Sequence, residues 1–212
     1  MPASAPPSPL RRRRHGPALE AQRDEILSAV RRLHASGGYP AVTMRSVSDA
    51  VGLAPMSLYR YFPNKLALLQ AVWDQVLEEA LVAAERAPVD GPQPIQELRR
   101  FYRGYVDYWL AEPGNYWLIF GIRDSGVGQP FSAGPAARFR QAVERRIDAC
   151  LPPDLGAEDR ARCYDLCRCK IVGYLFLAIH LVHKSHTQLH DLRDAVLDDI
   201  EHQLVRAGGA AV

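Results

Sequence analysis

Long hydrophobic runs are missing from this chain of 212 residues. Its most apolar stretch, residues 171–179, is interrupted by Gly173 and followed by His180, so it is well short of the roughly 18 apolar residues that a membrane helix needs. The first residues also lack a charged start followed by an apolar run, which is the pattern of a secretory signal. We therefore expect a cytoplasmic protein with no membrane partner.

Cysteine is scarce too, since the chain has only four, and Cys163, Cys167 and Cys169 crowd one helical segment. This spacing argues against the disulfide framework of a small secreted protein. No long stretch alternates apolar and polar residues with a period of two, so no strand is predicted. Nucleophile and base pairings and glycine-rich cofactor loops are missing as well, and we predict that the chain is not an enzyme and holds no cofactor.

The charge of the chain is small in total but uneven in its distribution. The formal net charge is +2, yet residues 1–65 contain ten Lys or Arg against four Asp or Glu, so the remainder is acidic. A basic N-terminal part suits contact with phosphate groups. An ordinary soluble surface is the alternative that charge alone leaves open.

Helical periodicity accounts for most of the chain. Three helices are predicted before residue 65, over 17–35, 44–51 and 55–62. Thr43 is suited to cap the second of them, Gly52 ends it in a tight turn, and Pro55 starts the third. Asn64 caps a longer helix, the prolines of segment 87–94 end it, and further helices are predicted over 95–110, 114–122, 135–150, 158–185 and 189–206. Residues 121–134 are predicted to form a mobile loop.

The two short helices joined by a glycine turn form a unit that can place its second helix in a DNA major groove about 12 Å wide. Arg60 is suited to pair with guanine, and Lys65 lies at a helix start, where phosphate oxygens bind. The predicted DNA-binding residues are Thr43, Arg45, Met56, Ser57, Tyr59, Arg60, Tyr61 and Lys65. The alternative is a plain helical hairpin of an enzyme or scaffold, in which Tyr59 and Phe62 are core aromatics.

These residues resemble the TetR family of transcriptional regulators. The resemblance is carried by TMRSVSDAVGL from Thr43 to Leu53 and by LYRYFPNKLALL from Leu58 to Leu69. It implies that Tyr59 and Lys65 contact backbone phosphates and that residues 56–61 read the operator. Tyr61 stands where members of the family often carry His.

The resemblance also implies an all-α fold, in which an N-terminal three-helix helix-turn-helix DNA-binding domain is joined to a larger helical ligand-binding and dimerisation domain. We expect a disordered basic arm over 1–16, the helix-turn-helix domain over 17–65 and the larger domain over 66–212. The arginines of residues 11–14 form either a solvated tail or an arm that reaches the neighbouring minor groove.

The last two predicted helices are apolar over more than one face, which suits a homodimer through a four-helix interface. The family resemblance implies both this dimer and a pocket for a small-molecule effector in the middle helices. The candidate lining residues are Phe101, Tyr105, Tyr108, Trp109, Trp117, Phe120 and Tyr174, whose alternative role is plain core packing.

Cys163 and Cys167 lie on one helical face, and His180, His183, His186 and His190 follow them. A metal or redox switch is the alternative that these residues leave open. A cysteine within a helix is more often a small buried hydrophobe, and neither group has compact tetrahedral spacing, so we predict no metal site.

Together these features predict a sequence-specific DNA-binding transcriptional regulator, with double-stranded operator DNA and a small effector as its partners. The leading interpretation is a repressor that an apolar or aromatic ligand releases from a palindromic operator. A helical carrier or enzyme with a non-functional DNA-binding head is one alternative. An activator or a nucleoid-type binder is another.

Overall fold

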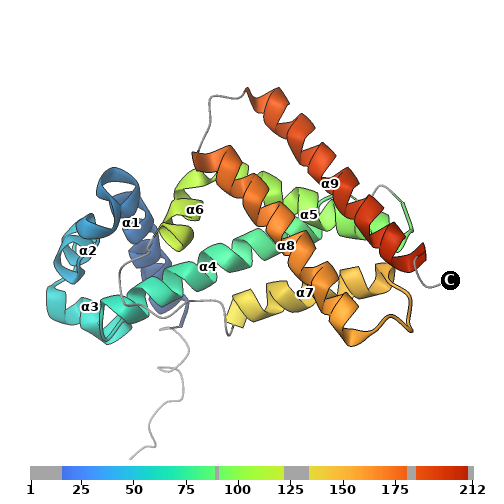
Figure 1. The fold of residues 1–212 in the computed structure, drawn as a ribbon. Helices are drawn as coiled ribbons and strands as arrows, with labels where there is room; N and C mark the ends of the chain where they lie inside the picture. The colour runs from blue at the N-terminus through green and yellow to red at the C-terminus, as the bar shows by residue number, and fades with distance from the viewer. Residues whose placement is uncertain (1–15, 89–90, 122–133, 181–184, 210–212) are drawn as a thin grey trace, which may run out of the picture. The chain divides into compact units, whose positions relative to one another are not determined.

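The computed structural model describes residues 16–88, 91–121, 134–180 and 185–209, all of which are helical or connect helices (Figure 1). The helices are α1 Gly16–Ala41, α2 Met44–Ala50, α3 Pro55–Tyr61, α4 Lys65–Arg86, α5 Pro94–Ala111, α6 Pro113–Phe120, α7 Gly134–Cys150, α8 Ala157–His180 and α9 His186–Gly209. The prediction of an all-α fold is confirmed. The predicted basic arm, with residues 11–14, and nearly all of the predicted loop over 121–134 lie outside the described residues.

The chain forms two compact units, one up to Val72 and one from Trp73 onward, and α4 runs through the point of division. We refer to them as the N-terminal unit and the C-terminal unit. No helix among the described residues has the length and apolar character that crossing a membrane requires.

The N-terminal unit packs α1 against α2 and α2 against α3. Its core contains Ile26, Val30, Val47, Leu58 and Phe62, none of which is more than 2% exposed. The helical backbone of α1 is interrupted at Gly37 and Gly38, just beyond residue 35, where the sequence predicts the helix to end.

The helical periodicity of the sequence puts Leu19 and Leu66 on the apolar faces of α1 and α4, but both side chains are exposed in the structure. Leu19 is 57% exposed, because it lies in the first turn of α1, outside the core of the unit. Leu66 is 41% exposed near the start of α4, where Leu68 faces the core in its place and is fully buried. The later part of the predicted α4 stripe is buried as expected, including Trp73 and Val76.

In the C-terminal unit, α5 is the helix around which the others pack, since it contacts α6, α7, α8 and α9. It also lies very close to α4 at Gly104. A methyl group added there would be 2.7 Å from the Ala83 carbonyl oxygen and 2.8 Å from Ala87 Cβ, closer than atoms pack. A residue without a side chain is therefore needed at this crossing.

Candidate nucleic-acid interface and effector site

The start of α2 is held by a reciprocal cap. The Ser46 amide donates to Thr43 Oγ1 at 3.0 Å, and the Thr43 amide donates to Ser46 Oγ at 2.9 Å. This capping box satisfies two amides that the first turn of a helix leaves without partners. The Thr43 hydroxyl, predicted to contact phosphate, is thus part of the helix cap in the structure.

The turn between α2 and α3 depends on Gly52, whose φ of 65° is in the left-handed region. The Leu53 amide donates to the Ser48 carbonyl oxygen at 2.9 Å, and the Gly52 amide donates to the Asp49 carbonyl oxygen at 3.3 Å. These bonds form a Schellman motif, which closes the last turn of α2. Pro55 then begins α3, where its missing N–H has no cost.

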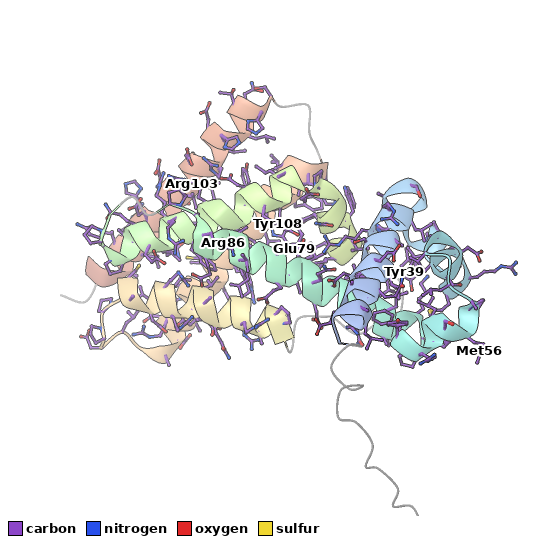
Figure 2. All side chains as sticks on the ribbon, turned by 180° about the vertical axis from the view of Figure 1, so that it is seen from behind. Tyr39, Met56, Glu79, Arg86, Arg103 and Tyr108 are labelled. Atoms are coloured by element: carbon purple, nitrogen blue, oxygen red, sulfur yellow. The ribbon has the colours of Figure 1, made fainter. Side chains whose placement is uncertain are left out.

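Helix α3 has one face in the core and one face in solvent. Leu58 is fully buried, whereas Met56 is 77% and Tyr59 45% exposed, and Arg60 is exposed as well. Figure 2 shows the Met56 side chain projecting from the helix. A large apolar side chain exposed beside a cation and a phenol is the composition expected of a surface that meets DNA bases.

Lys65 contacts Tyr39, which is not among the predicted site residues. Its ammonium lies 3.6 Å from the centre of the Tyr39 ring, and its Nζ donates to the Tyr39 carbonyl oxygen at 3.3 Å. Burial lowers the pKa of Lys65. Tyr39 therefore positions the first residue of α4, and the signal for this in the sequence was an aromatic residue directly after the two glycines that interrupt α1.

The other predicted cation is in a different environment. The Arg45 side chain is 89% exposed, and it pairs loosely with Asp49 at 3.9 Å. An exposed pair of this kind contributes little to stability, so Arg45 can turn toward another anion at small cost. Ser57 and Tyr61 are partly buried on α3. The predicted residues thus divide into an exposed set, Arg45, Met56, Tyr59 and Arg60, and a set engaged within the unit, Thr43 and Lys65.

A family model of bacterial regulatory proteins, the tetR family, matches residues 26–72, which span most of α1, all of α2 and α3 and the start of α4. This part of the chain belongs to the tetR family. This match confirms the resemblance found in the sequence. The matched family consists of regulatory proteins, which is consistent with the prediction that the chain is not an enzyme.

Curated relatives extend the similarity beyond the DNA-binding domain. Over 133 residues, 61% of this chain and 58% of the relative, it is 36% identical to the HTH-type transcriptional repressor KstR of Mycobacterium tuberculosis. Over 130 residues, 61% of this chain and 57% of the relative, it is 26% identical to the HTH-type transcriptional activator FasR of Mycolicibacterium smegmatis. The chain thus spans less than two thirds of the length of these relatives.

Solved structures share the fold at low sequence identity. A TetR family transcription regulator from Marinobacter aquaeolei superposes with a TM-score of 0.60 at 18% identity, covering 86% of this chain and 96% of that one. The helical order of this chain is therefore that of a known fold along most of its length.

In the C-terminal unit, most of the predicted effector residues form one continuous aromatic cluster. Tyr105 lies between Trp109 and Phe139, at centroid distances of 5.8 and 4.3 Å, and Trp109 lies 5.7 Å from Phe120. Phe101 and Tyr108 extend the cluster at its two ends. Phe101 and Trp109 are fully buried, and burial raises the pKa of the Tyr105 phenol. The sequence analysis missed Phe139 and Tyr116, which also belong to this cluster.

The other two predicted effector residues have different surroundings. Trp117 is 41% exposed, and its ring centre is 4.1 Å from that of His180 on α8. The Tyr174 hydroxyl donates to the Leu189 carbonyl oxygen at 2.8 Å and so connects α8 to α9. The seven predicted effector-binding residues therefore do not share one environment.

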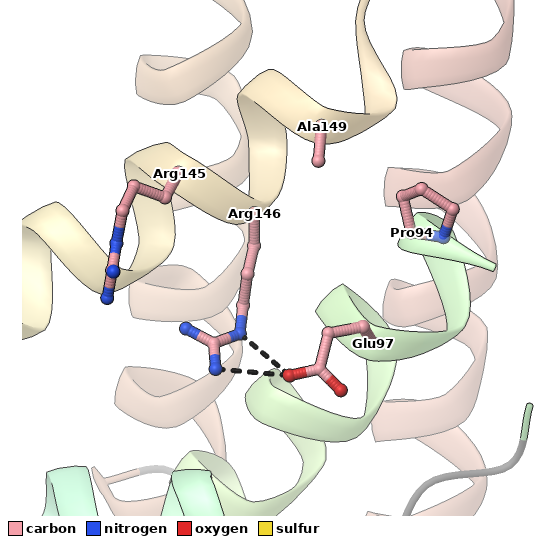
Figure 3. A pocket seen from close by; sticks show the side chains of 5 residues that line it. All are labelled: Pro94, Glu97, Arg145, Arg146 and Ala149. Carbon is pink, nitrogen blue, oxygen red and sulfur yellow. Dashed lines mark hydrogen bonds and ion pairs between the residues drawn. The ribbon is translucent and has the colours of Figure 1, made fainter. Parts of the chain in front are cut away.

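A pocket of about 270 Å³ lies between α5 and α7 (Figure 3), and its lining residue Arg146 lies over the Phe101 ring at 4.2 Å. It is lined by Pro94, Glu97, Arg145, Arg146 and Ala149, none of which the sequence analysis considered. Arg146 donates to Glu97 from two nitrogens at 3.2 and 3.1 Å. Opposite charges therefore neutralise each other within the pocket wall.

Glu97 also accepts from Arg100, a guanidinium group that is only 4% exposed. Hydrogen bonding to Arg100 holds the pKa of Glu97 below its ordinary value. Arg100 Nη1 donates to the carbonyl oxygens of Ala84, Glu85 and Ala87 at 3.0, 2.6 and 3.0 Å. This side chain thus satisfies carbonyl groups at the C-terminal end of α4.

One face of α8 is apolar and exposed. Leu166 is 43%, Val172 52%, Phe176 42% and Leu177 36% exposed. Val172 and Phe176 are four positions apart and Leu166 and Leu177 eleven, so each pair shares one side of the helix. We refer to these four residues as the α8 apolar face. Single exposed apolar residues are common, but a stripe of this length is typical of an interaction surface.

Two of the four cysteines, Cys163 and Cys167, are placed as small hydrophobes rather than as reactive groups. All four thiols are free, and Cys163 and Cys167 are buried in α8. Burial raises the pKa of Cys167 to about 12, which disfavours the thiolate that binds metals and reacts with oxidants. Among the residues that the structure describes, no group of three His, Cys, Asp or Glu side chains gathers to hold a metal ion.

Proposed function

We propose that the chain is a dimeric, sequence-specific DNA-binding repressor of transcription, which a small apolar or aromatic molecule releases from a palindromic operator. The observation that carries this proposal is the solvent face of α3. There Met56, Tyr59 and Arg60 are exposed on a short helix whose other face is anchored by Leu58 and Phe62.

Each exposed side chain of α3 has a chemical match in DNA. Arg60 can donate two hydrogen bonds to guanine O6 and N7, and Met56 can pack against a thymine methyl group. The Tyr59 hydroxyl suits a phosphate oxygen, as do the exposed Arg45 and the ammonium of Lys65. Phosphate contacts fix the position of the helix, and base contacts select the sequence.

The α8 apolar face supports the dimer. One recognition helix contacts few bases, and a two-fold dimer doubles the contact when it reads a palindrome. Replacement of Phe176 by Asp should yield a monomer in light-scattering measurements and weaken operator binding, whereas replacement of the exposed Leu19 by Asp should leave the dimer intact.

The aromatic cluster of α5, α6 and α7 supports an apolar or aromatic effector. Rings supply large apolar contact area, and their faces and edges favour other rings. The relatives support control of transcription, since one is named a repressor and one an activator. We favour repression because the longest match at above 30% identity is to the repressor.

Operator binding is tested with duplexes from the region upstream of the gene, by fluorescence anisotropy at fixed salt. Replacement of Arg60 by Ala should weaken specific binding about 5- to 150-fold, the equivalent of one bidentate base contact of about 1–3 kcal/mol. The matched control is Arg140→Ala, which removes an exposed arginine of α7 whose nearest acid, Glu144, is 3.8 Å away. Equal affinities of the two variants would contradict the assignment of α3 as the reading helix.

Effector release is tested by adding apolar and aromatic compounds to the preformed complex with operator DNA. A true effector should release DNA reversibly and be recovered unchanged. Chemical turnover of the compound, without an effect on DNA binding, would favour the carrier or enzyme alternative instead.

A further inference from the structure

Two histidines at the start of α9 have no part in the proposed function. His186 and His190 are four residues apart, and their Nε2 atoms are 3.0 Å from each other. The ring centres are 4.1 Å apart. Residues four apart lie on one face of a helix, so both rings project to the same side of α9.

We propose that His186 and His190 form a surface site for a divalent transition metal ion of the copper and nickel class. Neutral imidazole nitrogens are ligands for these metals, and the two Nε2 atoms, 3.0 Å apart, are close enough for one ion to bind both. In the absence of metal, one Nε2 donates a hydrogen bond to the other. In the metal-bound form both nitrogens are deprotonated and both lone pairs face the ion.

The separation of the two nitrogens indicates which geometry fits. With metal to nitrogen bonds of about 2.0–2.1 Å, ligands at a right angle are about 2.9 Å apart, and ligands at a tetrahedral angle are about 3.3 Å apart. The observed 3.0 Å is closer to the right angle. Square-planar or octahedral coordination is typical of Cu²⁺ and Ni²⁺, whereas Zn²⁺ in proteins is usually tetrahedral.

The helix start that carries the pair is itself well ordered by hydrogen bonds. Ser185 and Gln188 form a reciprocal cap, with the Ser185 amide donating to Gln188 Oε1 at 2.9 Å and the Gln188 amide donating to Ser185 Oγ at 3.3 Å. Tyr174 of α8 holds the carbonyl oxygen of Leu189 at 2.8 Å. The two rings are therefore carried on a backbone that does not have to reorganise when a metal binds.

The remaining coordination positions face solvent, since His186 is exposed and the described part of the chain brings no third ligand to the pair. Water completes the coordination. A metal ion bound there joins the first and second turns of α9 and so stabilises the end of α9 that Tyr174 fastens to α8.

The test uses tag-free full-length protein and NiCl₂ in a non-chelating buffer, because Cu²⁺ would oxidise an exposed thiol such as Cys169. Titration calorimetry should detect one Ni²⁺ per chain, and His190→Ala should weaken this binding at least tenfold. The matched control is His202→Ala, which removes an exposed histidine of the same helix whose Nδ1 contacts the Asp198 carbonyl oxygen at 2.7 Å. This control should bind as the wild type does.

A second measurement separates this site from weak general binding. Saturating Ni²⁺ should raise the melting temperature of the wild type and of His202→Ala but not of His190→Ala. Equal affinity in all three proteins, or an equal shift in melting temperature, would overturn the proposal. The outcome is independent of operator binding, which His190→Ala should leave unchanged without metal.

Discussion

In the N-terminal unit, the hydrogen bonds that shape α2 and the turn after it join residues three to five positions apart, such as Thr43 with Ser46 and Ser48 with Leu53. In the C-terminal unit, polar contacts join residues as far as 102 positions apart, as between Arg99 and Glu201. The first unit is shaped by short-range hydrogen bonds and exposes Met56, Tyr59 and Arg60, which are among the predicted DNA-binding residues. The second depends on distant partners and buries its aromatic side chains.

The two units should therefore respond differently to a substitution. A substitution in a local motif alters one turn and the helix that follows it. A substitution in the aromatic cluster affects α5 and, through α5, the four helices that pack against it, which are α6, α7, α8 and α9. The following experiments test this difference, beginning with the largest expected effect.

Replacement of Trp109 by Ala should lower the free energy of unfolding by about 3–5 kcal/mol, because a fully buried ring leaves a large cavity among its neighbours. Urea unfolding followed by circular dichroism measures it. Trp117→Ala is the matched control, since this ring is 41% exposed, and its cost should be clearly smaller. Equal costs for the two variants would mean that burial does not distinguish them.

Replacement of Gly104 by Ala should cost about 1–3 kcal/mol, because the new methyl group would overlap α4 at Ala83 and Ala87. Gly114→Ala is the control, since a methyl group there meets nothing within 4 Å. Gly114 is helical, so this control should be neutral or stabilising by up to about 1 kcal/mol. A destabilised control together with a neutral Gly104→Ala would contradict the close approach of α5 to α4 at Gly104.

Replacement of Gly52 by Ala should cost about 1–2 kcal/mol through the backbone alone, because φ is 65° and a methyl group meets nothing within 4 Å. Hydrogen exchange of the amides of α2 and α3 should increase, and operator affinity should fall with it. Gly52→Asn should cost less, since Asn tolerates the left-handed region. If Asn cost as much as Ala, backbone conformation would not be the reason for the glycine.

Replacement of Glu97 by Gln should remove part of the acid sensitivity of the C-terminal unit. Hydrogen bonding to Arg100 holds the pKa of Glu97 below its ordinary value of 4.5 in the folded state. Its contribution to stability is therefore complete above pH 4.5 and is lost as the pH falls through the lowered pKa. Urea midpoints between pH 7 and pH 3 should fall less steeply in Glu97→Gln than in Glu144→Gln, which removes an acid from an exposed pair with Arg140. Parallel curves would contradict this role for Glu97.

The sequence predicted the helix-turn-helix in detail because caps and turns are local. Asn64 was expected to cap the helix that follows it, and its Oδ1 does accept from the Ala67 amide at 2.8 Å. Thr43 and Gly52 were placed in the cap and the turn where the structure has them. The DNA-contact and effector roles of individual residues remain predictions.

By itself, then, the sequence determined the helices, the helix-turn-helix and the family, because each rests on residue types at fixed short spacings. The tertiary structure decided what spacing along one helix does not specify, which is the partner on another helix. Only the structure placed Lys65 on the Tyr39 ring, put Phe139 among the predicted effector residues and brought Arg146 to Glu97. It also turned Leu66 into solvent and Leu68 into the core, because burial depends on what packs against a helix as well as on its period.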